Sequence, residues 1–229
     1  MDPLRKNVSW IAGSSLIACT FMYIVEQGLD INYAIKTLIK IILFLSIPVL
    51  YAVRIKNKSI RWLSKRKQQP TDGLALSIGL GILSFACILL TYAVLQRFID
   101  LERISADLQT DLGITPRTFI FVALYVTFGN SLLEEYFFRG FVFLEMYKEG
   151  YRTSAYVFSS VLFGLYHIAI FQSWFPLPLM ILALAGLIGV AFVFNWLDAK
   201  SGTFVNSWVV HIFADTAIVL IGFRIFGIL

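Results

Sequence analysis

The chain has 229 residues, of which 59% are hydrophobic and only 14% are charged. Soluble domains carry about 25% charged residues, so this composition excludes an ordinary soluble domain and indicates a helical protein that crosses a membrane several times. The formal net charge of +5 does not indicate nucleic-acid binding, because the basic residues concentrate in one segment beside apolar runs, where they determine topology.

Seven apolar runs predict an all-α, polytopic transmembrane helical bundle of about seven spans. The first run follows Arg5 and Lys6, and we expect it to be retained, since no small-residue cleavage pattern of a signal peptide follows it. Lys36 and Lys40, near the start of the second run, are expected to extend to the membrane interface. The expected spans are residues 8–25, 33–53, 74–95, 116–147, 154–171, 177–197 and 204–223.

The strongest topology signal is the segment 54–67, which contains seven Lys or Arg residues and no acid. The positive-inside rule places this segment, and with it the N-terminus, in the cytoplasm. The segment 97–115 predicts an amphipathic helix on the opposite membrane surface, since its apolar residues are three and four apart. We expect one membrane-embedded domain over residues 1–229, in which residues 1–96 form three preceding spans, located in a cell membrane of bacterial inner or plasma type.

Three charged residues lie inside the apolar run 119–143, which otherwise carries no charge. A charged side chain near the bilayer centre costs about 2.5–3.5 kcal/mol on insertion scales, so these residues must be paired or functional. Glu135 and Arg139 are four residues apart with the acid first, which favours an intrahelical pair. Glu134 lies about 100° around the helix and has no such partner. We therefore expect Glu135 and Arg139 to neutralise each other and Glu134 to perform chemistry.

Both histidines of the chain, His167 and His211, also lie in apolar runs, and Asp215 follows His211 by four residues. A lone histidine in a helix bundle is more often a packing residue, but two histidines and a carboxylate on the face of one of them favour function. The Asp215 carboxylate can hydrogen-bond the His211 imidazole and fix its tautomer. If the fourth, fifth and seventh helices are neighbours, Glu134 joins them in one cavity. There a carboxylate can act as a general base for water, and imidazoles can orient the water or stabilise an oxyanion.

Three short motifs carry a resemblance to a known family. EEYFFRG resembles EExxxR, FGLYH resembles FxxxH and HIFAD resembles Hxxx(N/D), in that order and each on its own predicted span. Together they resemble the CPBP (Abi) family of intramembrane proteases, which includes CAAX prenyl endopeptidases and bacteriocin-processing and self-immunity proteins. The resemblance covers about residues 112–219, the CPBP-like catalytic core. It implies a glutamate-dependent endopeptidase that hydrolyses a peptide bond in a membrane-associated or lipid-modified substrate, without a metal or other cofactor.

The resemblance also implies a role for each motif residue. Glu134 and His167 would activate a water molecule, while His211 and Asp215 would stabilise the oxyanion. Asp215 stands where the CAAX enzymes have Asn, and an ionised Asp would repel an oxyanion. We therefore expect Asp215 to be protonated or to hold His211.

Two other interpretations stay open. Glu134, His167 and His211 could supply a His2Glu zinc site with an open position, although the sequence lacks HExxH. A non-catalytic scaffold, an immunity protein or a proton-coupled carrier would use the same buried residues, since proton relays in membranes are built from Asp, Glu and His. The confinement of these residues to the second half of the chain argues instead for one active site that opens laterally to the lipid bilayer and takes a membrane-associated peptide or protein.

Overall fold

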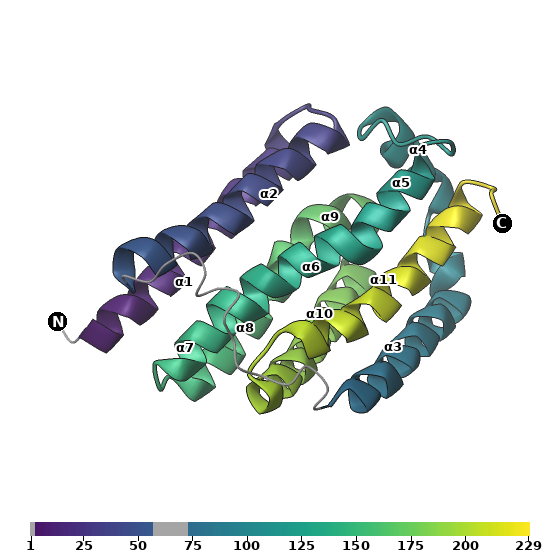
Figure 1. Ribbon diagram of the computed structural model, residues 1–229. Helices are drawn as coiled ribbons and strands as arrows, with labels where there is room; N and C mark the ends of the chain where they lie inside the picture. Colours follow the sequence, from purple (N-terminus) through teal and green to yellow (C-terminus); the bar gives the residue numbers. More distant parts are fainter. Residues whose placement is uncertain (1–2, 57–72) are drawn as a thin grey trace.

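The computed structural model describes residues 3–56 and 73–229, and these residues form an all-α bundle without strands (Figure 1). Six helices in the described part of the chain are long and apolar enough to cross a membrane. The expected all-α, polytopic class is therefore confirmed. The number of spans and the side of the N-terminus stay predictions, and residues 57–67 of the basic segment lie outside the described residues.

Most expected spans coincide with an observed helix. The helices are α1 (Pro3–Gly28), α2 (Tyr33–Leu50), α3 (Leu74–Leu95), α4 (Leu101–Thr110), α8 (Arg152–Tyr166), α9 (Ile168–Trp174), α10 (Leu177–Ser201) and α11 (Val205–Ile225). The helix α3 agrees with its predicted span at both ends.

Side chains cap the first turns of α2 and α4. Asn32 precedes α2 and Asp100 precedes α4, and each side chain accepts a hydrogen bond from the backbone N–H three residues later.

The predicted fourth span is an unbroken helical run in the middle of the bundle (Figure 1). It consists of α5 (Phe119–Leu124), α6 (Ser131–Glu134) and α7 (Leu144–Lys148), joined by the π-helical segments Tyr125–Asn130 and Glu135–Phe143. We call the whole run the central helix. Such π-helical turns are frequent at functional sites, and here they lie on both sides of α6, which ends at Glu134.

Aromatic side chains pack the central helix against its neighbours. Phe137 stacks on Phe44 of α2 with 4.1 Å between the ring centroids, and Phe138 meets Phe163 of α8 edge to face at 5.3 Å. Because lipid tails are as apolar as these rings, close packing rather than exclusion of water holds the helices together. The central helix is thereby held against both α2 and α8.

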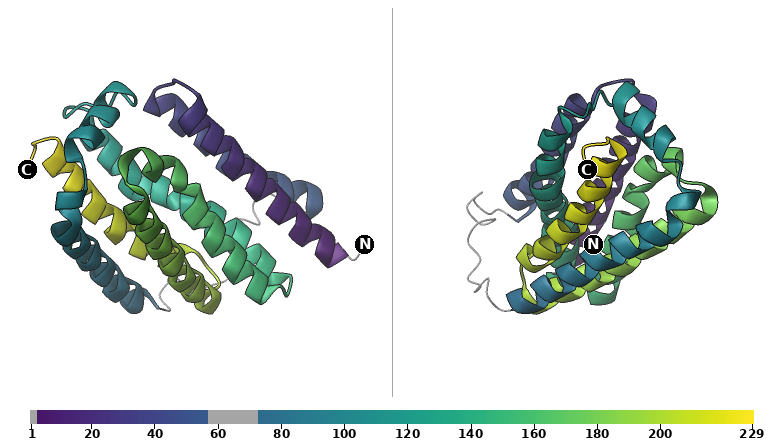
Figure 2. Two further views of the ribbon diagram at one scale, coloured as in Figure 1. Left: turned by 180° about the vertical axis from the view of Figure 1, so that it is seen from behind. Right: turned by 90° about the vertical axis from the view of Figure 1, so that its right-hand side faces the viewer.

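The three N-terminal spans divide between the two flanks of the bundle (Figures 1 and 2). α1 and α2 pair on one flank, whereas α3 packs along α11 on the other, and α10 packs against α8 and α11. α3 and α11 approach closely at Gly81, where an added Cβ would lie 2.5 Å from Cδ2 of Phe213. The C-terminal segments that carry the three motifs therefore lie between N-terminal helices.

The helix α10 is longer than the expected sixth span. Residues 198–203 lie between the expected sixth and seventh spans, but α10 continues to Ser201 and ends at Gly202, whose φ of 66° suits glycine. Asp198 is consequently buried at the end of α10, where its Oδ2 accepts a hydrogen bond from Ser207 Oγ at 2.7 Å. Its Oδ1 accepts a second from the Ser207 backbone N–H at 3.3 Å, so this carboxylate caps the first turn of α11.

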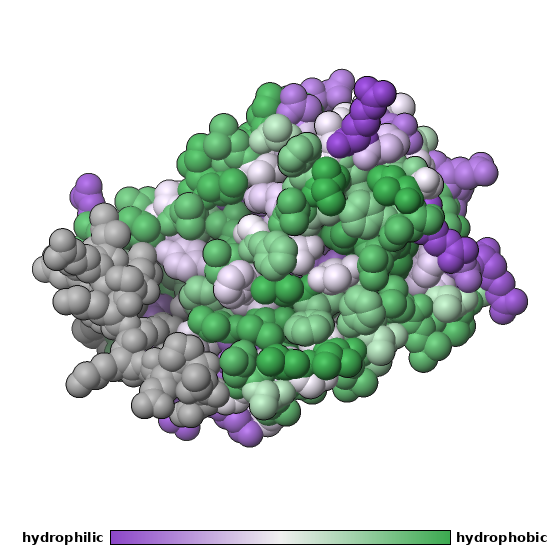
Figure 3. All heavy atoms as spheres, turned by 45° about the vertical axis from the view of Figure 1, so that its right-hand side comes forward, coloured by the Kyte–Doolittle hydropathy of each residue, from purple (hydrophilic) through white to green (hydrophobic). Residues whose placement is uncertain are grey.

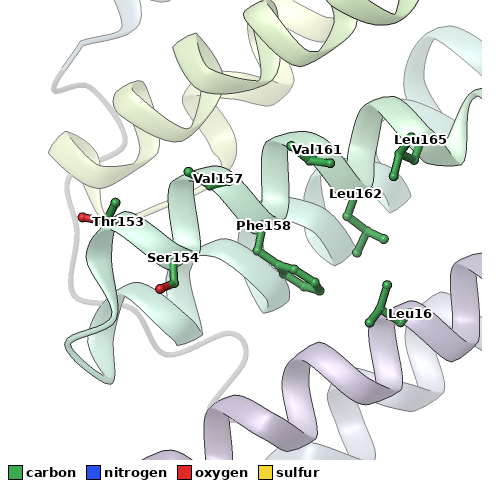
Figure 4. A pocket seen from close by; sticks show the side chains of 8 residues that line it. All are labelled: Leu16, Thr153, Ser154, Val157, Phe158, Val161, Leu162 and Leu165. Atoms are coloured by element: carbon green, nitrogen blue, oxygen red, sulfur yellow. The ribbon is translucent and has the colours of Figure 1, made fainter.

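The surface agrees with a lipid environment. Hydrophobic side chains cover a broad band, and hydrophilic ones gather at its margins (Figure 3). An apolar groove of about 470 Å³ lies between α1 and α8 (Figure 4). It is separate from the buried charges described below, because its lining contains no ionisable residue; it consists of Leu16, Thr153, Ser154, Val157, Phe158, Val161, Leu162 and Leu165.

The contact between α3 and α11 can be tested at Gly81. Gly81→Leu should destabilise the protein by about 1–3 kcal/mol, because the new side chain would overlap the ring of Phe213. Gly79→Leu is the matched control, since it lies on the same helix and nothing lies within 4 Å of its added Cβ. Thermal unfolding in detergent should show a loss for Gly81→Leu alone, and equal melting of the two variants would contradict the contact.

Candidate active site

Glu134 lies at the centre of a buried polar cluster, with only 2% of its surface exposed. Its Oε1 accepts hydrogen bonds from Lys40 Nζ of α2 at 2.6 Å and from Asn130 Nδ2 at 3.0 Å. Its Oε2 lies 3.8 Å from Nε2 of His167 and 3.9 Å from Nε2 of His211. The structure therefore brings together the glutamate and both histidines from the central helix, the α8–α9 junction and α11.

His167 lies at the break between α8 and α9. Its ring Nδ1 is 2.7 Å from the backbone carbonyl oxygen of Phe163. A carbonyl oxygen only accepts, so Nδ1 carries the hydrogen and Nε2 of the neutral ring is an acceptor. The Nε2 lone pair therefore lies on the side of the ring that faces Glu134.

His211 on α11 is held mainly by Glu135. Its Nδ1 donates to Glu135 Oε1 at 2.8 Å, whereas its Nε2 lies 3.5 Å from Oδ1 of Asp215. The second distance is longer than an ordinary hydrogen bond. The sequence led us to expect that Asp215 fixes the imidazole, but the shorter contact comes from Glu135, one residue after the candidate catalytic glutamate.

The expected pair between Glu135 and Arg139 is formed. Arg139 Nη1 lies 3.2 Å from Glu135 Oε1, and both side chains are fully buried. The guanidinium also lies 3.9 Å from the ring centroid of Phe163 and 5.0 Å from that of Phe194, which stabilises its charge by cation–π interaction. Glu135 therefore links Arg139 to His211 through one carboxylate oxygen.

Two lysines of α2 differ from the sequence prediction. Lys40 does not extend to the membrane interface; besides Glu134 its ammonium donates to Asn130 Oδ1 at 2.5 Å. Lys36 is also buried, and its Nζ donates to the Glu26 carbonyl oxygen at 2.8 Å. A signal existed in the sequence, since the two lysines share one helical face within an apolar run, but it did not reveal their partners.

The zinc interpretation gains no geometric support. Among the residues that the structure describes, no group of three or more His, Cys, Asp or Glu side chains is arranged as a metal site requires.

The fold and this cluster define a polytopic membrane protein with a buried carboxylate–imidazole site. Residues 116–217 match the family described as Rce1-like, type II CAAX prenyl endopeptidase Rce1-like. This segment contains Glu134, His167, His211 and Asp215, and the match confirms the resemblance inferred from the motifs, since residues 116–217 are similar to the CAAX-type proteases. No curated protein and no solved structure matches the chain.

The buried pair predicts a specific stability defect. Arg139→Ala leaves the Glu135 carboxylate without its guanidinium, and removal of one partner from a buried pair typically costs about 3–5 kcal/mol. We expect low abundance and early thermal unfolding. The double variant Glu135→Gln with Arg139→Gln should recover part of the stability, since neither side chain is charged. An Arg139→Ala protein that accumulates and melts like wild type would contradict the structural role of the pair.

Proposed function

We propose that the protein is an intramembrane endopeptidase in which Glu134 and His167 activate a water molecule. The observation that carries this proposal is the 3.8 Å separation between Glu134 Oε2 and His167 Nε2, both of which are acceptors. Hydrogen bonds of about 2.8 Å allow one water to bridge two atoms at this distance. Such a water donates a hydrogen to each acceptor, and its lone pairs are left to attack a peptide carbonyl carbon.

The remaining residues fit the later steps. Glu134 takes a proton as the water oxygen bonds to the carbonyl carbon, and returns it to the amine nitrogen as the C–N bond breaks. In its imidazolium form His211 donates from Nδ1 to Glu135 and can donate from Nε2 to the developing oxyanion. Glu135 and Arg139 keep that ring in place through their shared contact.

The matched family and the surroundings of the site support one class of substrate. The matched family is described as a type II CAAX prenyl endopeptidase, and the site lies among apolar helices. We propose that the substrate is a membrane-associated or lipid-modified peptide or protein, cleaved within the cell membrane. A CAAX peptide carries its prenyl group on a cysteine near the C-terminus, so a farnesylated peptide of this type is the first probe.

The catalytic role of Glu134 is tested by Glu134→Gln, which keeps the size of the side chain and removes the base. Turnover of a farnesylated, fluorophore-labelled CAAX peptide should be abolished while the protein stays folded and peptide binding stays close to wild type. The melting temperature should fall, because the buried Lys40 ammonium loses its anionic partner. His167→Ala should also abolish turnover, because the water loses its second acceptor. His211→Ala should lower kcat by roughly 10²–10³-fold, the effect of losing one oxyanion donor.

Controls separate this mechanism from the alternatives. The same peptide without its farnesyl group measures whether the lipid is required. Prolonged treatment with a strong chelator should leave activity unchanged; activity that is lost and then returns with zinc would move Glu134 and both histidines to a metal site. Equal cleavage by wild type and Glu134→Gln would overturn the glutamate mechanism and leave a non-catalytic role for the cluster.

Asp215 is tested by two substitutions. Asp215→Asn should retain most of the activity, because an amide at this position can still contact His211 Nε2 and can donate to an oxyanion. Asp215→Ala should lower kcat, since both functions are lost. Comparison of kcat with the farnesylated peptide decides the point, and an equally large loss for Asn and for Ala would show that the negative charge itself is needed.

A further inference from the structure

Lys40 connects α2 to the carboxylate at the centre of the site. We infer that Lys40 is a positioning residue, which together with Asn130 holds Oε1 of Glu134 and so directs Oε2 toward the two histidines. This inference rests on the proposed function of Glu134. It adds to the reaction centre a residue that lies outside the matched segment 116–217.

Lys40 is buried, and Glu134 neutralises its positive charge. The side chain is about 10% exposed, and its Nζ lies 5.1 Å from the ring centroid of Tyr166 and 5.7 Å from that of Phe44. An ammonium enclosed in this way requires an anionic partner, because an unpaired charge inside a membrane is costly. Glu134 Oε1 at 2.6 Å is that partner.

The hydrogen bonds of Asn130 have a fixed direction. An ammonium has only donors, so the Asn130 atom 2.5 Å from Lys40 Nζ is the amide oxygen. The amide nitrogen is thereby turned toward Glu134 Oε1, to which it donates at 3.0 Å. Lys40, Asn130 and Glu134 form a closed triangle in which every hydrogen bond has a donor and an acceptor.

Because of this triangle, the two carboxylate oxygens of Glu134 have different roles. Oε1 is held by donors from α2 and from the central helix, so rotation of the carboxylate would break both hydrogen bonds. Oε2 stays beside Nε2 of His167 and His211, at 3.8 and 3.9 Å. Preorganisation of this kind matters, because a misplacement of about 1 Å can cost about 10²-fold in rate.

Lys36 provides a matched control on the same helix. It lies one turn before Lys40 and is equally buried, with 7% of its surface exposed against 8% for Lys40. Its ammonium contacts Glu26, through the carbonyl oxygen at 2.8 Å and the carboxylate Oε2 at 3.5 Å. Lys36→Met therefore removes a buried ammonium from α2 without removing a hydrogen bond to Glu134.

The activity experiment compares Lys40→Met, Lys40→Arg and Lys36→Met in the full chain, with the farnesylated peptide as substrate. Lys40→Met should lower kcat by about 10²-fold with KM little changed, because the catalytic carboxylate is misplaced while the peptide site is intact. Lys40→Arg, which keeps a donor and a positive charge, should restore part of kcat. Lys36→Met should keep the wild-type kcat. A purely structural role would reduce the folded fraction in both Met variants alike and would not split kcat from KM.

A second experiment measures thermal unfolding and does not depend on an activity assay. Lys40→Met should lower the melting temperature, because Glu134 stays buried without its ammonium, and adding Glu134→Gln to that variant should raise the melting temperature again. If Lys40→Met does not accumulate, Asn130→Ala removes the other donor to Oε1 and should lower kcat about tenfold.

The outcomes distinguish the two proposals. A Glu134→Gln protein that still cleaves the peptide overturns the proposed function, whatever Lys40 does. An inactive Glu134→Gln together with a folded Lys40→Met of wild-type kcat overturns the positioning role alone. An Asn130→Ala protein with wild-type kcat overturns it too, where Asn130→Ala is the variant measured.

Discussion

Compensation of charge inside an apolar bundle is the constraint on which this structure depends. Glu134 and Glu135 are adjacent on the central helix, and neither faces bulk water. Each carboxylate has its own cation, Lys40 from α2 for Glu134 and Arg139 from the same helix for Glu135. Because an unpaired charge in a membrane is costly, the helices that carry these partners must pack where they do.

Because of these two ion pairs, the neighbouring carboxylates of Glu134 and Glu135 have different roles in the site. Glu134 offers one oxygen to the histidines and keeps the other in hydrogen bonds. Glu135 instead accepts a hydrogen bond from the His211 ring and pairs with Arg139. A doublet of acidic residues at one turn of a helix thus serves both as the proposed base and as the support of the residue opposite it.

The arrangement also gives the N-terminal helices a part in the site. α2 carries Lys40 into the cluster and packs Phe44 on the central helix, while α3 supports α11 through the contact of Gly81 with Phe213, two residues beyond His211. The family match covers residues 116–217 and includes neither α2 nor α3. The motif residues alone therefore do not make up the whole environment in which the chemistry would occur.

Composition and apolar run lengths were sufficient to predict an all-α membrane bundle, and helical spacing predicted the pair of Glu135 with Arg139, because both depend on neighbours along the chain. Three short motifs also indicated the family and its motif residues. Only the tertiary structure decided the partner of Glu134, the hydrogen bond between His211 and Glu135, and the burial of Asp198. Lys40 and Glu134 are 94 residues apart, and such a contact depends on which helices pack together, which periodicity within one helix does not encode.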